Sequence, residues 1–197
     1  MAPIVRARPN AATPPRLPPT IPALTTPRLQ LRGFGAIDVD AVVALAGDAE
    51  VSRYLLQVPY PYPRQLAEQW IATHPEIWSR GGGPTWAIER RRDRRVIGSI
   101  SLHWSARHER CELGYWLGRR FWGRGYGRES AAAAVGFGFD VLEVHRVYAQ
   151  HLGGNDRSAT VLRAIGMTFE GVRRDHIKKG AAYHDLHGYA RLRGERP

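Results

Sequence analysis

Cysteine is almost absent from this chain, which has Cys111 as its one thiol in 197 residues. One cysteine excludes an intramolecular disulfide and a cysteine-based zinc cluster. The chain also has no apolar run close to the roughly 20 residues of a membrane span, and its N-terminus has no apolar signal-peptide core. Because 43% of the residues are apolar, we expect one cytoplasmic domain with a full core and no membrane partner.

Lysine is nearly as scarce, since Lys178 and Lys179 are the only two lysines among 29 basic residues. Arginine therefore supplies most of the formal net charge of +11. A positive field favours an anionic partner, such as a polyphosphate cofactor, an acidic peptide or nucleic acid, and charge alone does not choose among them. The chain has no RNP-like pattern, helix-turn-helix pattern or basic stripe with stacking aromatics, so nucleic acid is the least favoured substrate.

The eight histidines do not form a metal-binding pattern. His103 and His108 flank Trp104, and His184 stands near His187, but these spacings fit no zinc finger and no helical metal motif. No set of carboxylates or cysteines accompanies them. We therefore expect no metal site.

Prolines are concentrated at the N-terminus, where residues 1–27 hold eight of the 14 prolines and no acidic residue. This composition is typical of an extended or disordered arm. We assign residues 1–24 to the arm and residues 25–197 to the domain, which begins with the alternating strand Arg28–Arg32. The arm is either a non-essential extension or a proline-rich docking ligand.

Beyond the arm, helix and strand patterns alternate along the chain. Apolar spacing separates the two kinds of element, and proline or glycine ends them. Prolines at positions 59, 61 and 63 make the segment before the second helix a loop with exposed aromatic residues. We predict helices over 38–46, 63–74, 128–139 and 159–165, and strands over 28–32, 85–89, 96–102, 111–117, 144–152, 168–177 and 182–192.

Glycines on alternate positions mark the segment Trp122–Gly127, which follows a strand and precedes an alanine-rich helix. Such glycines lose packing in a strand or a helix, but they suit a loop that brings bare backbone close to a ligand. At a helix entrance, unpaired N–H groups and the positive dipole end form an anion site, most naturally for phosphates. Four arginines frame this loop: Arg119, Arg120, Arg124 and Arg128.

Two familiar phosphate loops fit this segment poorly. A P-loop requires Gly-x-x-x-x-Gly-Lys-Ser/Thr, and no lysine stands here. The dinucleotide fingerprint requires GxGxxG with an acid at the end of the next strand. Here the glycines run GxGxG, and Glu143 precedes that strand.

The loop resembles the acetyl-CoA signature of the GNAT acetyltransferases, Gln/Arg-x-x-Gly-x-Gly/Ala. Gly125 and Gly127 match its last two positions, while Trp122 stands where Gln or Arg is commonest. An aromatic-Trp-Gly-Lys/Arg-Gly-Tyr loop is usual in the RimJ/RimL branch of that family, so the loop with Trp122 resembles the loop of that branch. Three more segments resemble that branch and occur in the same order along the chain: Thr26–Arg32, Asn155–Met167 and Tyr183–Asp185. The resemblance covers about residues 25–192.

This resemblance implies an α+β fold, with a central mixed, mostly antiparallel sheet of six to seven strands flanked by helices. It implies an N-acetyltransferase, acting as a monomer or homodimer, that moves an acetyl group from acetyl-CoA to a primary amine. That amine is the N-terminal α-amine of a protein, such as a ribosomal protein, or belongs to a small molecule. The implied acetyl-CoA contacts are Trp116, Leu117, Gly118, Trp122, Gly123, Arg124, Gly125, Tyr126, Gly127, Asn155 and Ser158.

The acceptor amine is expected to meet aromatic side chains. In the resembled family the loop before the second helix forms one wall of the acceptor cleft, so Tyr60 and Tyr62 are candidates for substrate contact, together with Trp104. An equally good interpretation is that the two tyrosines merely cover the core.

Glu112 is the best candidate for the base that accepts the proton of the amine. It lies in an apolar strand leading to the loop, where a carboxylate has no structural purpose; the alternative is a solvent-facing residue like Glu109. In RimJ/RimL-like enzymes a serine placed like Ser158 is thought to protonate the leaving thiolate, although Ser158 on sequence alone is first a helix N-cap. Tyr115 is a second acid candidate, on the opposite face of the strand from Glu112.

Two classes of function therefore stand. One is the N-acetyltransferase, and the other is a degenerate GNAT fold that acts as an acyl-CoA-binding or regulatory module. Retention of Glu112, Asn155 and Ser158 favours the enzyme.

Overall fold

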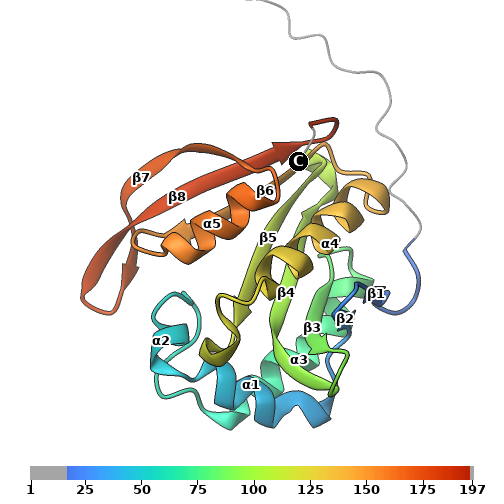
Figure 1. Cartoon of the computed structure of the whole chain (residues 1–197), viewed down its shortest axis with the longest axis vertical. Coiled ribbons are helices and arrows are strands. Elements are labelled where there is room, and N and C mark those ends of the chain that lie inside the picture. Colours follow the sequence, from blue (N-terminus) through green and yellow to red (C-terminus); the bar gives the residue numbers. More distant parts are fainter. Residues whose placement is uncertain (1–16, 196–197) are drawn as a thin grey trace, which may run out of the picture.

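An eight-stranded sheet forms the centre of the molecule (Figure 1). The computed structural model describes residues 17–195. The strands are β1 Leu24–Thr25, β2 Leu29–Arg32, β3 Thr85–Arg90, β4 Arg95–Ser105, β5 Arg110–Leu117, β6 Arg146–Leu152, β7 Thr168–Lys179 and β8 Ala182–Leu192. Their order in the sheet is β1-β2-β3-β4-β5-β6-β8-β7. The pair β5 and β6 is parallel, and the other six neighbouring pairs in this described sheet are antiparallel.

This topology confirms the α+β fold with a mixed, mostly antiparallel sheet. The expected strand count was one short, because the two-residue β1 lies in a proline-rich segment without strand patterning. Residues 17–24, which the sequence assigned to the arm, pack on the domain. The indole N–H of Trp78 donates to the Pro18 carbonyl at 2.9 Å, and that of Trp86 donates to the Pro22 carbonyl at 2.7 Å. Residues 1–16 of the predicted arm lie outside the described part of the chain.

Helices cover both faces of the sheet (Figure 1). They are α1 Val39–Ala46, α2 Ala49–Ser52, α3 Arg64–Ser79, α4 Tyr126–Asp140 and α5 Asp156–Ala164, with 3₁₀ turns η1 Ala36–Asp38, η2 Ala106–His108 and η3 Arg119–Phe121. On one face α4 contacts β4 and β5, and α5 contacts β6 and β7; on the other face α1 packs against β4 and β5, beside α3. Between residues 17 and 195 no helix has the length and apolar character needed to cross a bilayer.

Helix α3 continues past the expected end at His74 and contains Pro75. Proline normally disrupts a helix interior because it has no N–H to donate. Here Ile71, His74 and Trp78 share one buried stripe at helical spacing. The burial of Trp78, which is 1% exposed, offsets the lost hydrogen bond. The local proline signal was overridden by packing.

The main core lies between the sheet and α4. Every residue of β3 is buried, and the ring of Trp86 meets Phe137 of α4 edge-on at 5.2 Å. A Cβ at Gly138 would lie 3.3 Å from Val147 Cγ2, so this glycine lets the helix approach the sheet closely. The other glycine of the helix interior, Gly136, has no sheet atom within 4 Å of such a Cβ.

Arg32 joins two buried carboxylates on the α1 face of the sheet. Its Nε donates to Glu89 at 2.7 Å, and its two terminal nitrogens donate to Asp38 at 2.7 and 2.9 Å. The side chains of Asp38 and Glu89 are each 4% exposed. Burial alone would raise the pKa of Asp38, but hydrogen bonds from Arg32 and from the Gly35 N–H outweigh it and hold the pKa below its ordinary value.

Replacing Arg32 with methionine should lower the free energy of unfolding by about 3–5 kcal/mol, because Asp38 is left buried without its counter-charge. The depressed pKa of Asp38 gives the wild type stability that is present above about pH 4 and lost as the pH falls further. In the variant, the unpaired buried carboxyl favours its protonated form. Acidification from about pH 6 to pH 4 should therefore restore part of the variant's stability, as measured by urea unfolding at both pH values.

Arg64→Met is the matched control. Arg64 pairs with Asp40 and Glu68 on the surface, where ion pairs contribute little, so we expect no measurable change in stability. Equal losses in the two variants, or an Arg32→Met stability that falls on acidification, would contradict the role given to Arg32.

Candidate functional site

A gap opens in the sheet where β5 and β6 part. Their parallel register ends at Leu113 opposite Ala149, although β5 continues to Leu117 and β6 to Leu152. The Gly118 N–H donates to Ile97 of β4 at 3.0 Å, and hydrogen-bonding direction alternates along an antiparallel strand. The backbone groups of Tyr115 and Leu117 consequently face the gap rather than β4.

A cleft of about 520 Å³ occupies this gap. Its walls come from the ends of β5 and β6, the glycine loop, the first turn of α4, helix α5 and residues 51–55. Arg128 and Arg157 line it, and no carboxylate is among its lining residues in the described chain. Nine of the predicted acetyl-CoA contacts line the cleft: Trp116, Leu117, Trp122, Gly123, Gly125, Tyr126, Gly127, Asn155 and Ser158.

Gly118 and Arg124 were also predicted to contact acetyl-CoA, but they are not among the residues that line the cleft. Gly118 is needed for packing, because a Cβ there would lie 2.5 Å from Leu45 Cδ2 of α1. The carbonyl of Arg124 accepts a hydrogen bond from Arg28 at 3.0 Å. Both residues therefore shape the loop from outside the cleft.

The glycine loop turns sharply into α4. Gly123 and Gly125 have φ angles of 69° and 78°, a region that residues with a Cβ rarely adopt. Gly125 is the N-cap, so α4 begins two residues before its predicted start, and no side chain caps this end. The first-turn N–H groups are thus left for an anion. Gly127 brings α5 close, since its Cβ would lie 3.3 Å from Val161 Cγ2.

Glu129 in the first turn of α4 does not cap the helix, because its carboxylate is held elsewhere. It accepts hydrogen bonds from the Thr26 hydroxyl at 2.6 Å and from Arg28 Nε at 2.6 Å. Burial would raise the pKa of Glu129, but these donors outweigh it and lower the pKa. The helix entrance is thereby anchored to the start of the domain while its N–H groups stay free of side chains.

Tyr115 and Ser158 meet at the inner end of the cleft. Their hydroxyl oxygens lie 2.8 Å apart, and burial raises the pKa of Tyr115 to about 12. The sequence suggested Ser158 as the N-cap of α5, but the N-cap is Asn155. The Asn155 Oδ1 accepts the Ser158 N–H at 3.2 Å. The Ser158 hydroxyl is therefore available to Tyr115 rather than to the helix backbone.

Glu112 lies half-buried on the opposite face of β5 from Tyr115. Its carboxylate accepts hydrogen bonds from the Tyr148 hydroxyl at 3.1 Å and from Gln150 Nε2 at 3.0 Å. The other end of the Gln150 amide accepts from Arg173, which fixes the orientation of that amide because arginine only donates. Glu112 itself is not among the cleft-lining residues, but Gln150 is.

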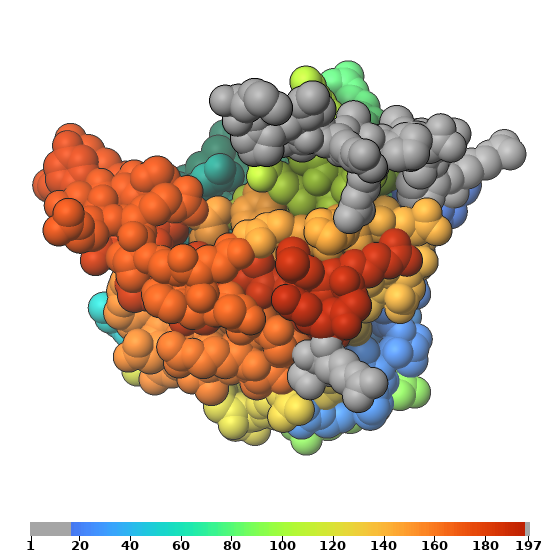
Figure 2. All heavy atoms as spheres, turned by 90° about the horizontal axis from the view of Figure 1, so that it is seen from above, coloured from blue at the N-terminus to red at the C-terminus, as the bar shows by residue number. Residues whose placement is uncertain are grey.

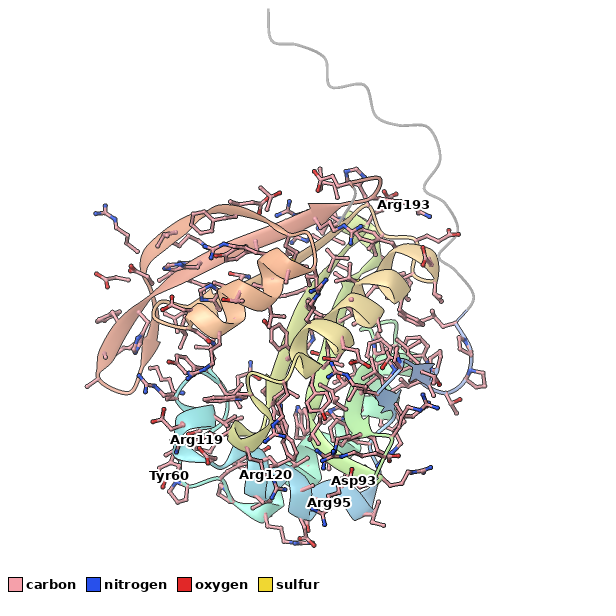
Figure 3. All side chains as sticks on the ribbon, in the orientation of Figure 1. Tyr60, Asp93, Arg95, Arg119, Arg120 and Arg193 are labelled. Carbon is pink, nitrogen blue, oxygen red and sulfur yellow. The ribbon has the colours of Figure 1, made fainter. Side chains whose placement is uncertain are left out.

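The three predicted acceptor contacts lie outside this cleft. Tyr60 is 67% exposed, and Figure 3 shows it at the lower rim of the molecule, in the same region as Arg119 and Arg120. Tyr62 packs on the small apolar cluster of α1 and α3, and Trp104 packs on the main core. The interpretation that the two tyrosines cover the core fits Tyr62 but not the exposed Tyr60.

The cleft has a wall that sequence reasoning missed, formed by Val51, Tyr54 and Leu55. The Tyr54 hydroxyl donates to the Gly154 carbonyl at 3.3 Å. Lys179, at the tip of the β7–β8 hairpin, donates to the carbonyls of Ser52 and Leu55. This hairpin projects beyond the body of the molecule (Figure 2). No local pattern could reveal a wall that depends on contacts between residues 100 or more positions apart.

His151 is a second cleft residue that the sequence did not single out. In the sequence it is only one of eight histidines without a metal-binding pattern. The strand register places it on β6 beside the gap, where it lines the cleft. No group of three metal-ligating side chains occurs in the part of the chain that the structure describes.

Comparison with known sequences identifies the family. The family described as "Acetyltransferase (GNAT) domain" matches residues 28–168. The uncharacterized N-acetyltransferase YoaA of Bacillus subtilis is 31% identical over 170 residues, which cover 86% of this chain and 96% of the relative. The ribosomal protein uS5-alanine N-acetyltransferase of Escherichia coli is 31% identical over 67 residues, or 34% of each chain.

Solved structures show the same fold. The GNAT-family acetyltransferase from Bacillus anthracis superposes with a TM-score of 0.79 at 23% identity, over 88% of this chain and 99% of that one. RimL, the ribosomal L7/L12 alpha-N-protein acetyltransferase in complex with coenzyme A, superposes with a TM-score of 0.77 at 22% identity. The match covers 85% of this chain and 95% of that one. The splayed strands, the uncapped helix entrance and these matches agree, and the chain belongs to the GNAT family of acetyl-CoA-dependent N-acetyltransferases.

Proposed function

We propose that this enzyme acetylates the α-amine at a protein N-terminus by direct attack, with Glu112 as the base and Ser158 as the acid. The observation that carries the proposal is the arrangement on β5. Glu112 and the Tyr115–Ser158 hydroxyl pair lie on opposite faces of one strand, three residues apart, where that strand leaves its parallel neighbour. The proton that the amine loses and the proton that the leaving sulfur gains can thus be handled on opposite faces of one strand.

The cleft suits the acyl donor. Acetyl-CoA supplies a thioester carbonyl that is activated toward amines. The free N–H groups at the start of α4, with Arg128 and Arg157, would hold its phosphates. The open backbone groups of Tyr115 and Leu117 would pair with its amide arm. The Leu117 carbonyl already accepts the Trp122 indole N–H at 2.7 Å, which leaves the Leu117 N–H and both groups of Tyr115 for this pairing.

Ser158 is suited to donate a proton to the departing sulfur. Its hydroxyl is bonded to that of Tyr115, and the raised pKa of Tyr115 keeps the phenol protonated at neutral pH. When Ser158 gives up its proton, Tyr115 can replace it through the existing hydrogen bond. The pair therefore acts as a two-residue proton relay, and Ser158 does not have to remain as an alkoxide.

Glu112 is suited to collect the proton that the amine loses. Two neutral donors, Tyr148 and Gln150, hold its carboxylate, and between residues 17 and 195 no lysine, arginine or histidine forms an ion pair with it. Because Gln150 and not Glu112 lines the cleft, we infer that a water molecule carries the proton between the amine and Glu112.

The choice of a protein α-amine as the acceptor is supported by similarity to the ribosomal protein uS5-alanine N-acetyltransferase of Escherichia coli. It is tested by a screen of N-terminal peptides, polyamines and aminoglycosides with acetyl-CoA, read by thiol release. Turnover confined to peptides with a free α-amine supports the proposal. Turnover only with polyamines or aminoglycosides would overturn it in favour of a small-molecule acetyltransferase.

Gly125→Val should abolish acetyl-CoA binding while leaving the protein folded, because a branched residue at φ 78°, with its Cβ 3.2 Å from Arg28 Nη2, distorts the backbone of the helix entrance. The control is Gly180→Val, at φ 61° with no atom within 4 Å of a Cβ. Both variants carry a similar backbone strain of about 1–2 kcal/mol, so their melting temperatures should fall together. Calorimetric titration should show normal acetyl-CoA affinity in the control, and unchanged affinity in Gly125→Val would sink the anion-loop assignment.

Glu112→Gln should lower kcat by roughly 10² or more at neutral pH, the usual range for general base catalysis. Acetyl-CoA affinity should survive. The loss should shrink as the pH passes the pKa of the acceptor, about 8 for an α-amine and about 10.4 for a lysine, because a free amine needs no base. The pH of recovery therefore reports the acceptor class.

Glu109→Gln is the control for that experiment, since Glu109 is exposed in the turn before β5 and should keep wild-type kinetics. A wild-type kcat and pH profile in Glu112→Gln would remove Glu112 from the mechanism and leave substrate alignment as the main catalytic device.

A further inference from the structure

His151 is a buried polar side chain that the proposed mechanism does not use. It is 7% exposed and lines the cleft. Its Nδ1 lies 2.8 Å from the Leu152 carbonyl oxygen, whereas its Nε2 is buried without a hydrogen-bond partner among the described residues. Buried nitrogens are rarely left unpaired, and among the cleft-lining residues His151 is the one with such a nitrogen in the described chain.

The chemical state of the ring follows from its contacts. A carbonyl only accepts hydrogen bonds, so Nδ1 carries the hydrogen and Nε2 presents a lone pair. Burial lowers the pKa of His151, which keeps the ring neutral. The rings of Tyr189, at 5.5 Å, and His187, at 5.0 Å, hold it in place. Nε2 is therefore a fixed acceptor that needs an N–H, O–H or S–H donor.

The strand register places this acceptor beside the hydroxyl pair. Leu113 and Ala149 form the last parallel pair. Tyr115 and His151 are each two residues further along their strands, and side chains two residues apart share a face. Both residues line the cleft, and Tyr115 contacts Ser158. The two strands thus carry the Tyr115 side chain and the His151 ring on the same face, one on each side of the gap.

We propose that His151 Nε2 forms a thiol-binding subsite, which accepts a hydrogen bond from the S–H of coenzyme A once the acetyl group has left. This inference rests on the proposed function, which brings the sulfur to the Tyr115–Ser158 pair. In the transfer, the amine nitrogen bonds to the acetyl carbon, and the carbon–sulfur bond breaks with its electron pair on sulfur. Sulfur then takes the proton of Ser158.

The subsite distinguishes product from donor. The thioester sulfur of acetyl-CoA has no hydrogen, so Nε2 stays unpaired while the donor is bound. The thiol of coenzyme A has one and satisfies Nε2. His151 therefore stabilises the thiol product selectively, which helps the forward step and makes free coenzyme A a product inhibitor that competes with acetyl-CoA.

The test compares the dissociation constants of coenzyme A and desulfo-coenzyme A, in which hydrogen replaces the thiol, by calorimetric titration. Wild-type protein should bind coenzyme A about two- to tenfold more tightly than the desulfo analogue, the usual effect of one neutral hydrogen bond. In His151→Phe, which keeps a ring of similar size, that ratio should fall to about one. His108→Phe, in the exposed turn before β5 and away from the cleft lining, is the control and should keep the wild-type ratio.

Three outcomes overturn the subsite. The ratio can persist in His151→Phe, it can be about one already in the wild type, or His151→Phe can weaken acetyl-CoA, coenzyme A and the desulfo analogue equally, which would assign Nε2 to an amide of the arm. Failure of wild-type protein to bind any of the three would instead contradict the donor site itself.

A measurement on the unmodified protein guards against a variant that does not fold. In protein with ¹⁵N-labelled histidine, the Nε2 resonance of His151 should move on addition of coenzyme A, toward that of a hydrogen-bonded nitrogen. It should stay in place with acetyl-CoA or the desulfo analogue. The same shift with all three ligands, or with none, would refute the thiol contact.

Discussion

The parting of β5 from β6 is the constraint on which the rest of the structure depends. The two strands keep a parallel register for four residues, from Arg110 opposite Arg146 to Leu113 opposite Ala149, and then diverge. Backbone groups left unpaired inside a protein must find another partner. Helices α4 and α5 cover the same face of the sheet on either side of this opening. The interruption of pairing between β5 and β6 thus leaves backbone groups that an extended ligand can bind.

The parts of the site that the sequence predicted are those with local causes. The alternating glycines predicted a loop of bare backbone at a helix entrance, and Gly123 and Gly125 there adopt positive φ. Alternation along β5 put Glu112 and Tyr115 on opposite faces. The N-cap of α5 was wrong because Asn155 and Ser158 are both good capping residues. Their three-residue spacing lets either begin the helix, and in the structure the Asn155 side chain accepts the Ser158 N–H.

The parts that the sequence could not predict depend on distant contacts. Helix α3 runs through Pro75 because Trp78 is buried against a segment near Pro18. The wall at Val51–Leu55 needs the β7–β8 hairpin, because Lys179 donates to the carbonyls of Ser52 and Leu55. His151 is unremarkable in the sequence, and only the register of β6 against β5 brings it level with Tyr115. In each case an interaction across the fold outweighs a local preference.

The Lys179 contact with the carbonyls of Ser52 and Leu55 also sets an order of assembly. The donor side of the cleft comes from residues within the span 113–164, whereas this contact joins positions 127 and 124 residues apart. Contacts of such long sequence separation form late, because they require a large loop to close. During synthesis, the wall at residues 51–55 can form its Lys179 contacts only after the β7–β8 hairpin has left the ribosome. A nascent chain therefore completes its donor side before its opposite wall.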